Sequence, residues 1–165
     1  MSSDEMKRAN RMAELKTVDY VDVKMYMGTW FEIARFPQGF EKGLVGVTAD
    51  YTLLPNGNVR VLNTGHKQDL NGDLKTVKGK ARVVDSATNA KLKVSFFWPF
   101  AGDYWILELG RDYEYAVVGD ESRKYLWILS RTAQMDDAVY NGLLERARDR
   151  GFDISKLEKV PQKHA

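Results

Sequence analysis

Apolar and polar residues alternate along most of this chain, from about residue 30 to residue 131. A period of two residues is typical of β-strands that bury one face and expose the other. Turn residues such as Pro55-Asn56-Gly57-Asn58 interrupt the alternation at short intervals, as expected for antiparallel hairpins. We predict strands over residues 30–35, 47–54, 59–64, 76–84, 91–98, 104–109, 113–119 and 125–131.

The pattern changes to a helical one after the last of these strands. Between Asp136 and Arg150 the apolar residues recur every three or four positions, and Gly151 follows. We predict one amphipathic helix whose apolar side is formed by Val139, Leu143, Leu144 and Ala147. Its expected place is the outer face of the sheet, against Phe31 and Ile33. Residues 152–160 are expected to return as an edge strand or an extended arm.

Eight consecutive strands with short connections favour an all-β fold. Closing the sheet into an up-and-down antiparallel barrel removes both exposed edges, and a barrel of eight strands can hold one small ligand. A chain of 165 residues fits a single domain of this kind. We predict a mobile leader over residues 1–20, a barrel with one outer helix over residues 21–160, and a frayed tail over residues 161–165.

One end of the predicted barrel is expected to be closed by the segment that starts at Gly28. If successive strands alternate in direction, then Trp30, the turn at Asp112 and Tyr113, and Arg131 meet at the same end. The Arg131 guanidinium can stack there on the Trp30 indole. The simpler interpretation of Gly28 and Trp30 is an ordinary core tryptophan after a turn glycine. The opposite end is rimmed by loops over residues 37–46, 65–73, 99–103 and 119–123.

Alternation also predicts which side chains point into the barrel. Small residues at inward positions, namely Ala34, Ala49, Gly79 and Ala81, favour an internal cavity over a filled core. The alternative is that the inward aromatic residues fill the barrel, which then serves only as an interaction surface. The predicted ligand-binding residues are Phe36, Phe40, Ala49, Tyr51, Val61, Asn63, Val83, Phe96, Trp98, Trp105, Leu107 and Trp127.

Composition narrows the possible chemistry. The chain has no cysteine, which excludes disulfides, thiol catalysis and cysteine-based zinc sites, and its two histidines have no obvious acidic partner. We therefore predict no catalytic residues, no metal and no cofactor. The net charge of +2 comes from interspersed residues, 25 basic and 23 acidic, so a nucleic-acid partner is not expected. No run approaches the roughly 20 apolar residues of a membrane span.

Three stretches of the chain resemble the defining motifs of the lipocalin family. They are Gly28-Thr29-Trp30-Phe31-Glu32, the turn Asp112-Tyr113, and Leu126-Trp127-Ile128-Leu129-Ser130-Arg131. Longer matches over residues 30–36, 93–100 and 125–131 are similar to the bacterial lipocalin and apolipoprotein D branch. The resemblance covers roughly residues 21–160. Arg111 stands where many relatives have threonine, and the disulfides of apolipoprotein D-like members are missing here.

The resemblance implies a carrier that binds, stores or transports a small hydrophobic ligand, as a monomer or weak homodimer. The alternative is a lipid-modifying enzyme on the same barrel, because a few lipocalins act on bound lipids. Bacterial members are commonly outer-membrane lipoproteins anchored through an N-terminal lipidated cysteine. We therefore expect such a cysteine before Ser2 in the precursor and a place on the periplasmic face of the outer membrane. If the reading frame begins at Met1, the protein is cytoplasmic.

A fatty acid or a lysophospholipid is the expected ligand. Its chain is predicted to lie among Ala49, Val61, Val83, Leu107 and Trp127, below aromatic residues at the open end. Lys42 and Lys67 are expected near its head group. Arg131 is expected to close the barrel and not to bind the ligand, since it lies at the opposite end.

Overall fold

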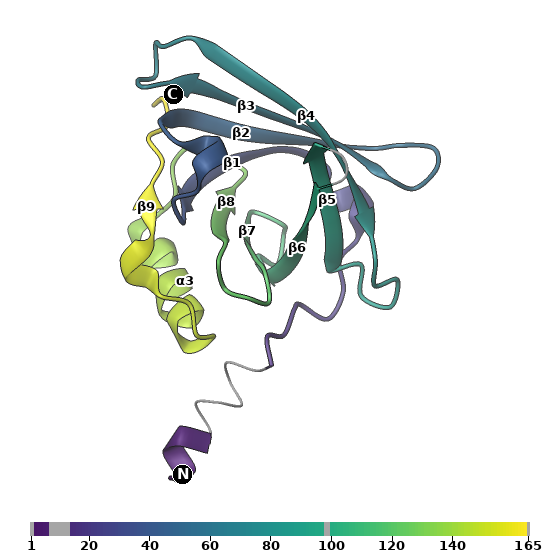
Figure 1. The fold of residues 1–165 in the computed structure, drawn as a ribbon, viewed down its shortest axis with the longest axis vertical. Coiled ribbons are helices and arrows are strands. Elements are labelled where there is room, and N and C mark those ends of the chain that lie inside the picture. The colour runs from purple at the N-terminus through teal and green to yellow at the C-terminus, as the bar shows by residue number, and fades with distance from the viewer. Residues whose placement is uncertain (1, 7–13, 98–99, 165) are drawn as a thin grey trace.

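The computed structural model describes residues 2–6, 14–97 and 100–164, and it shows the predicted β-barrel (Figure 1). All neighbouring strands pair antiparallel in the order β2-β3-β4-β5-β6-β7-β8-β1-β9, and an additional pairing of β1 with β2 closes the barrel. The strands are β1 Gly28–Arg35, β2 Leu44–Leu53, β3 Val59–Lys67, β4 Leu74–Val83, β5 Lys91–Phe97, β6 Phe100–Leu109, β7 Tyr115–Gly119, β8 Leu126–Ser130 and β9 Glu158–Lys159. The all-β, eight-stranded closed barrel is therefore confirmed.

Several strands are longer at the open end than the sequence indicated. β2 begins at Leu44 and not at Val47, β3 continues to Lys67, and β6 begins at Phe100. The main-chain pairing Leu44↔Lys67 shows that these extensions still belong to the β2–β3 ladder. A glycine interrupts each extension, at Gly46, Gly65 and Gly102, so the side chains there show no regular alternation that the sequence alone reveals.

The predicted helix is present as α3, Asp137–Asp149, and covers the outer face of the sheet beside β9 (Figure 1). Asp136 caps it by accepting hydrogen bonds from the main-chain N–H groups of Ala138 and Val139. Its buried side is formed by Tyr140, Leu143 and Ala147, which pack in one cluster with Ile33. The expected apolar position Val139 is instead 39% exposed. We call this cluster, between the sheet and α3, the outer core.

The end of the chain is tied to the barrel. A 3-10 helix, η2 Ile154–Lys156, leads into β9, which pairs with Ala34 and Arg35 of β1 as an edge strand. Beyond the expected boundary at residue 160, Gln162 is buried and its Nε2 donates to the carbonyls of Glu32 and Val47, at 2.8 and 2.9 Å. The expectation of a frayed tail therefore does not apply to Gln162.

The leader is also partly docked. Residues 3–6 form a helical turn, and Leu15 is buried in the outer core. The main-chain N–H of Val18 donates to the carbonyl of Ile106 at 3.0 Å, so the second half of the expected mobile segment lies on the barrel. The short helix α2, Val23–Tyr26, then places Tyr26 beneath Trp30, with ring centroids 5.0 Å apart.

The closed end is built as predicted around Trp30, which is fully buried. The Arg131 guanidinium lies 3.8 Å from the centre of the indole and donates to the carbonyls of Met25, Thr29 and Tyr113. The φ of +99° at Gly28 places its backbone against the same guanidinium, 3.4 Å from where a Cβ would stand. Arg131 therefore joins the start of β1, the turn before β7 and the end of β8.

The turn at Asp112 and Tyr113 contributes through Tyr113 and not through Asp112. The Tyr113 hydroxyl accepts a hydrogen bond of 2.8 Å from the main-chain N–H of Asp22, the residue that caps α2. The Asp112 side chain is exposed. The turn thus fastens the segment that plugs the barrel.

Removing either partner at the closed end should destabilise the protein. We expect Trp30→Ala to lower the free energy of unfolding by ~3–5 kcal/mol, because a large buried side chain leaves a cavity. Arg131→Ala should lower it by about 2 kcal/mol or more, since charged hydrogen bonds to three carbonyls are lost. Denaturant unfolding measures both. The exposed Arg111→Ala in the same turn is the control and should change stability by less than ~0.5 kcal/mol; equal effects at Arg111 and Arg131 would contradict the assignment.

Candidate functional site: an internal cavity

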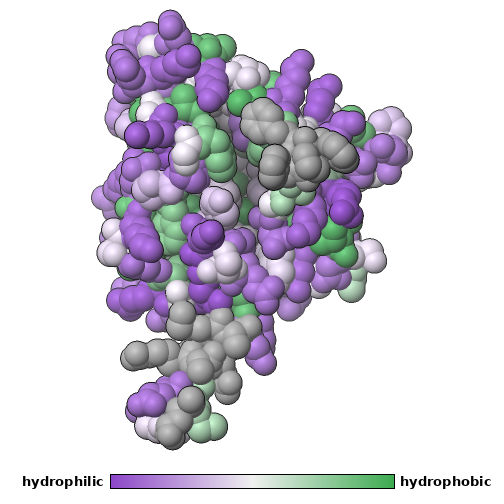
Figure 2. Space-filling view, in the orientation of Figure 1, coloured by the Kyte–Doolittle hydropathy of each residue, from purple (hydrophilic) through white to green (hydrophobic). Residues whose placement is uncertain are grey.

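A cavity of about 330 Å³ lies inside the barrel, within the size range of small-molecule sites. It reaches the surface beside Phe40, whose side chain is 49% exposed. The molecular surface on the face seen in Figure 2 is mainly hydrophilic, with hydrophobic side chains between the hydrophilic ones. The residues that line the cavity are Glu32, Phe40, Glu41, Ala49, Tyr51, Val61, Asn63, Val94, Phe96, Ala101, Gly102, Asp103, Tyr104, Tyr125, Trp127 and Leu129.

Many residues expected at the ligand site lie on this wall. They are Phe40, Ala49, Tyr51, Val61, Asn63, Phe96 and Trp127. Val83 packs against the barrel interior without lining the cavity, and Trp98 lies outside the described residues. The alternation along β2, β3 and β8 thus placed these side chains on the correct face.

Trp105 and Leu107 were expected inside the barrel, and this was wrong. A bulge between Ile106 and Glu108 in the β6–β7 ladder shifts the alternation, and Leu107 is buried in the outer core. Trp105 also packs against the outer core, with Lys91 Nζ 4.2 Å from its ring centre. Tyr104 and Ile106 face inward in their place. Because one extra residue reverses the side-chain direction, alternation on either side of a bulge cannot be read as one strand.

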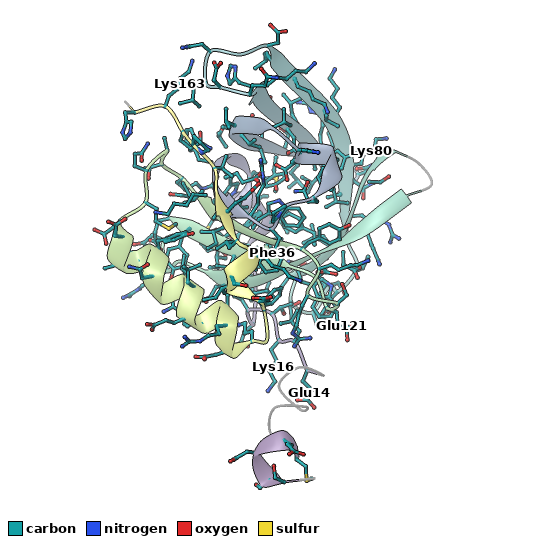
Figure 3. All side chains as sticks on the ribbon, turned by 60° about the vertical axis from the view of Figure 1, so that its left-hand side comes forward. Glu14, Lys16, Phe36, Lys80, Glu121 and Lys163 are labelled. Atoms are coloured by element: carbon teal, nitrogen blue, oxygen red, sulfur yellow. The ribbon has the colours of Figure 1, made fainter. Side chains whose placement is uncertain are left out.

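Phe36 is a second correction. It is 4% exposed and packs in the outer core with its ring centroid 6.1 Å from that of Phe152 (Figure 3). The cause is a bulge between Glu32 and Ala34 in the β1–β8 ladder. After that bulge Ala34 lies in the outer core, although it too was expected to face the cavity.

The inference from small inward residues to free space inside the barrel holds only in part. Of the four small positions, Ala49 lines the cavity, whereas Ala34 faces outward. A Cβ added at Gly79 would lie 2.6 Å from the Phe96 ring, so this ring already occupies the space beside Gly79. The missing side chain at Gly79 therefore positions an aromatic wall and does not itself create free volume.

Aromatic residues form the cavity mouth. Phe40 is on the 3-10 helix η1, Gly39–Glu41, in the loop between β1 and β2. Tyr125 and Trp127 stack nearly parallel, with centroids 5.7 Å apart and planes 4° apart. Trp127 Nε1 donates to Glu41 Oε1 at 3.0 Å, which ties the loop to β8.

A buried ion cluster of Glu32, Arg35 and Glu41 lies beside this mouth. Arg35 Nη1 is 3.4 Å from Glu32 Oε1 and 3.3 Å from Glu41 Oε2, and each of the three residues is less than 10% exposed. Arg35 Nη2 donates to the carbonyl of Leu44 at 2.8 Å, and Nε contacts the half-exposed Glu158 at 3.2 Å. Both carboxylates of the cluster line the cavity.

The two carboxylates share one arginine, and this affects their ionisation. Burial raises the pKa of Glu32 well above its usual range, and the neighbouring Glu41 raises it further, while Arg35 acts in the opposite direction. For Arg35, burial alone would lower the pKa, but Glu32, Glu41 and Glu158 together raise it. Glu32 therefore takes up a proton at a higher pH than an ordinary glutamate does.

The charged residues on the cavity wall are acidic, whereas lysines were expected near the head group. Lys42 and Lys67 are exposed, and neither lines the cavity. The charged lining residues that the structure describes are Glu32, Glu41 and Asp103, and Asp103 is paired with Lys93 Nζ at 2.5 Å. The mouth is thus acidic and aromatic.

The cavity floor carries a tyrosine cluster of Tyr26, Tyr51 and Tyr104. The Tyr104 hydroxyl is 2.6 Å from that of Tyr26 and 2.9 Å from that of Tyr51. Tyr51 and Tyr104 line the main cavity, and all three tyrosines line a small void of about 20 Å³ toward the closed end. The tyrosine cluster therefore lies between the two spaces, and Tyr26 faces only the smaller one.

A closed antiparallel barrel around an apolar cavity that opens at one end defines a class of binding proteins for small hydrophobic molecules. The chain belongs to the lipocalin family, because the model described as a lipocalin-like domain matches residues 21–162. The match agrees with the motifs at Trp30 and Arg131. Among the described residues, no helix is long and apolar enough to cross a membrane.

Relatives of known name confirm the resemblance to bacterial lipocalins. The chain is 46% identical over 145 residues to outer membrane lipoprotein Blc of Escherichia coli K12, covering 88% of this chain and 81% of that protein. It is 45% identical over 158 residues to temperature-induced lipocalin-1 of Arabidopsis thaliana, covering 90% and 83%. Insecticyanin of Manduca sexta has the same fold, with a TM-score of 0.74 and 20% identity over 92% of this chain and 86% of that one.

Some residues of the cavity wall and of the ion cluster beside it were missed by sequence reasoning. Arg35 was assigned to the outer face, Glu41 to a loop, and Tyr104 to the wrong side of its strand. The available signal was the clustering of Glu32, Arg35 and Glu41 within ten residues around a strand end. Charged residues so near a predicted barrel mouth need partners if they are buried.

Replacing Glu32 with a neutral glutamine should stabilise the protein, and the gain over the parent should grow as pH rises. In the folded protein the pKa of Glu32 lies above the unfolded value of about 4.3. The stabilisation that comes from the protonated carboxyl is therefore complete below that pH, and it is lost as pH rises toward the folded pKa. Glu32→Gln cannot ionise, and its melting temperature should exceed that of the parent increasingly from pH about 4.3 upward, with about 2–4 °C for each kcal/mol.

Thermal unfolding over a pH series measures this effect. Glu158→Gln is the matched control, because Glu158 contacts the same arginine but its side chain is 48% exposed. It should show no comparable gain. A Glu32→Gln advantage that is independent of pH would contradict the assignment of Glu32 as the titrating group.

Proposed function

We propose that this protein binds a single-chain lipid, a fatty acid or a lysophospholipid, in the barrel cavity and carries it without chemical change. The observation that supports this most directly is the cavity of about 330 Å³ whose wall combines aliphatic and aromatic side chains with an opening at one end. Burying an apolar chain there removes its surface from water, at roughly 25 cal/mol per Å². The family as a whole binds small hydrophobic ligands, in agreement with this proposal.

The chain of the lipid would lie between the middle of the barrel and its floor. Val61, Val94 and Leu129 offer the aliphatic contacts, and Ala49 leaves space between them and the mouth. This replaces the expected contacts with Val83 and Leu107, which do not line the cavity. The head group would lie beside Phe40, Tyr125 and Trp127, where the cavity reaches the surface.

The charges at the mouth favour a lysophospholipid with a zwitterionic head over a free fatty acid. A fatty acid carboxylate would meet the carboxylates of Glu41 and Asp103 on the cavity wall, whereas their cationic partners Arg35 and Lys93 do not line the cavity, so like charges are the nearer ones. A cationic head such as choline would instead meet carboxylates and the aromatic faces of Tyr125 and Trp127. Carboxylates and aromatic rings together are the usual recognition elements for quaternary ammonium groups.

We further propose that the native protein is attached to the outer membrane through a lipidated N-terminal cysteine and faces the periplasm. Support comes from the relatives named outer membrane lipoprotein Blc, one of which is 46% identical to this chain. The genomic sequence upstream of Ser2 tests this. A signal peptide followed directly by a cysteine agrees with the proposal, and a reading frame that starts at Met1 contradicts it.

Blocking the cavity should abolish lipid binding. Ala49→Trp places an indole in the space near the mouth, so we expect the dissociation constant for lysophosphatidylcholine to rise by at least about tenfold. Quenching of Trp127 fluorescence during titration follows binding. Lys42→Ala is the control, because Lys42 is exposed and does not line the cavity. Equal affinity of Ala49→Trp and the parent would refute the cavity site, and recovery of hydrolysed lipid would indicate the enzymatic alternative.

Fatty acid binding should depend on pH in a way that lysophospholipid binding does not. At neutral pH we expect hexadecanoate to bind more weakly than lysophosphatidylcholine of the same chain length, because its carboxylate faces the acidic mouth. The difference should shrink as pH falls through about 4.3, where carboxylic acids become neutral. Titrations of both lipids at several pH values test this. Tighter binding of the fatty acid at neutral pH would contradict the head-group preference.

A further inference from the structure

The tyrosine cluster holds three phenol groups in fixed positions at the cavity floor. The rings of Tyr26 and Tyr51 stack with centroids 5.8 Å apart, and Tyr104 meets both edge-on, at 6.5 and 6.0 Å. Tyr26 is 5% and Tyr51 9% exposed. Such packing leaves the hydroxyl oxygens little freedom to move away from one another.

Counting hydrogens shows that this cluster has one donor too many. Three hydroxyls supply three hydrogens, but the contacts within the described structure that involve these hydroxyls are only Tyr26–Tyr104 and Tyr51–Tyr104. Each contact uses one hydrogen, so one O–H remains without an acceptor. Three arrangements of the donors are possible, and they leave the spare hydrogen on Tyr26, Tyr51 or Tyr104. In two of the three it is on Tyr51 or Tyr104, and both of these residues line the main cavity.

The spare hydrogen matters because of where it lies. Water can accept it when no lipid is bound, whereas the methyl end of an alkyl chain cannot. A buried donor left unpaired is more unfavourable than the hydrogen bond it replaces is favourable. Burial also raises the pKa of Tyr104 and of Tyr51, so these phenols stay protonated and keep donating at any physiological pH.

We propose that the tyrosine cluster is a deep polar subsite that accepts an oxygen atom on the buried end of the ligand. The preferred ligands would be lipids whose chain carries a hydroxyl or keto oxygen far from the head group. The remaining wall at this depth, formed by Val61, Val94 and Leu129, is aliphatic, whereas the polar lining residue Asn63 stands opposite Ala49, nearer the mouth. An oxygen that faces the aliphatic wall therefore finds no hydrogen-bond partner there. This inference rests on the proposed function, since it concerns the far end of the same bound lipid.

The experiment compares matched lysophosphatidylcholines of several chain lengths, with and without a hydroxyl on the terminal carbon. A hydroxyl moved into an apolar pocket normally weakens binding. In the wild-type protein we expect the reverse at the chain length that reaches the floor, with the hydroxylated lipid bound about three- to tenfold more tightly than the plain one. Isomers with a mid-chain hydroxyl should bind more weakly than either.

Phenylalanine substitutions identify the donor. Tyr51→Phe combined with Tyr104→Phe removes both hydroxyls that line the main cavity, so the preference for the hydroxylated lipid should disappear while the plain lipid still binds. Tyr26→Phe is the control, because Tyr51 and Tyr104 then keep one contact and one spare hydrogen on the cavity side. It should retain the preference.

The outcomes separate this inference from the proposed function. If the plain lipids bind but a terminal hydroxyl weakens binding at every chain length, the subsite is refuted and the lipid-binding proposal stands. The same holds if the double variant discriminates as the wild type does. If neither lysophosphatidylcholine nor hexadecanoate binds, both are refuted. The wild-type comparison decides the question even if the double variant does not fold.

Discussion

The contact between Arg131 and Trp30 is the constraint on which the rest of the barrel depends. Arg131 follows β8, Trp30 lies in β1, and the carbonyls of Met25 and Tyr113 bring in the α2 segment and the turn before β7. Segments a hundred residues apart are thus fixed at one end by a single guanidinium. Because that end is closed by packing and hydrogen bonds, the opposite end can leave its interior partly unfilled, and the cavity lies there.

Alternation predicted the barrel, the helix and the closed end, because these follow from patterns repeated over many residues. It failed where one residue breaks the repeat. The bulge after Glu32 reverses the direction of the side chains that follow it, so Ala34 and Phe36 lie outside while Arg35 contributes inside. The bulge after Ile106 leaves Leu107 and Glu108 both on the outer side, so counting back from Glu108 assigns Tyr104 to the wrong face. The sequence carries no local mark of either bulge, since neither residues 32–34 nor residues 106–108 include a glycine or a proline. Tertiary pairing with β8 and β7 decides where the extra residue is placed.

The cavity combines two polar regions that sequence reading did not separate. The ion cluster of Glu32, Arg35 and Glu41 lies near the mouth, and the tyrosine cluster lies at the floor, with aliphatic residues between them. Neither region is evident from its residue types, because each depends on contacts between segments that are far apart in the chain. Ala49 and Trp127 could be placed from alternation alone, whereas Tyr104 required the register of β6. An interior that is polar at the mouth, aliphatic in the middle and polar at the floor suits a ligand with polar groups at both ends.

The side chain of Gln162 bridges a split in the barrel wall. β1 pairs with β2 only from Gly28 to Phe31, and beyond that point the two strands diverge, with β9 taking over the edge of β1. Gln162 joins the carbonyls of Glu32 and Val47 across this gap, and the main-chain N–H of Gly46 donates to the carbonyl of Pro161. The seam beside the cavity mouth is therefore completed by the last part of the domain to be synthesised. The barrel therefore cannot be sealed until the segment after β9 has docked, so the apolar interior stays accessible until that late step of folding.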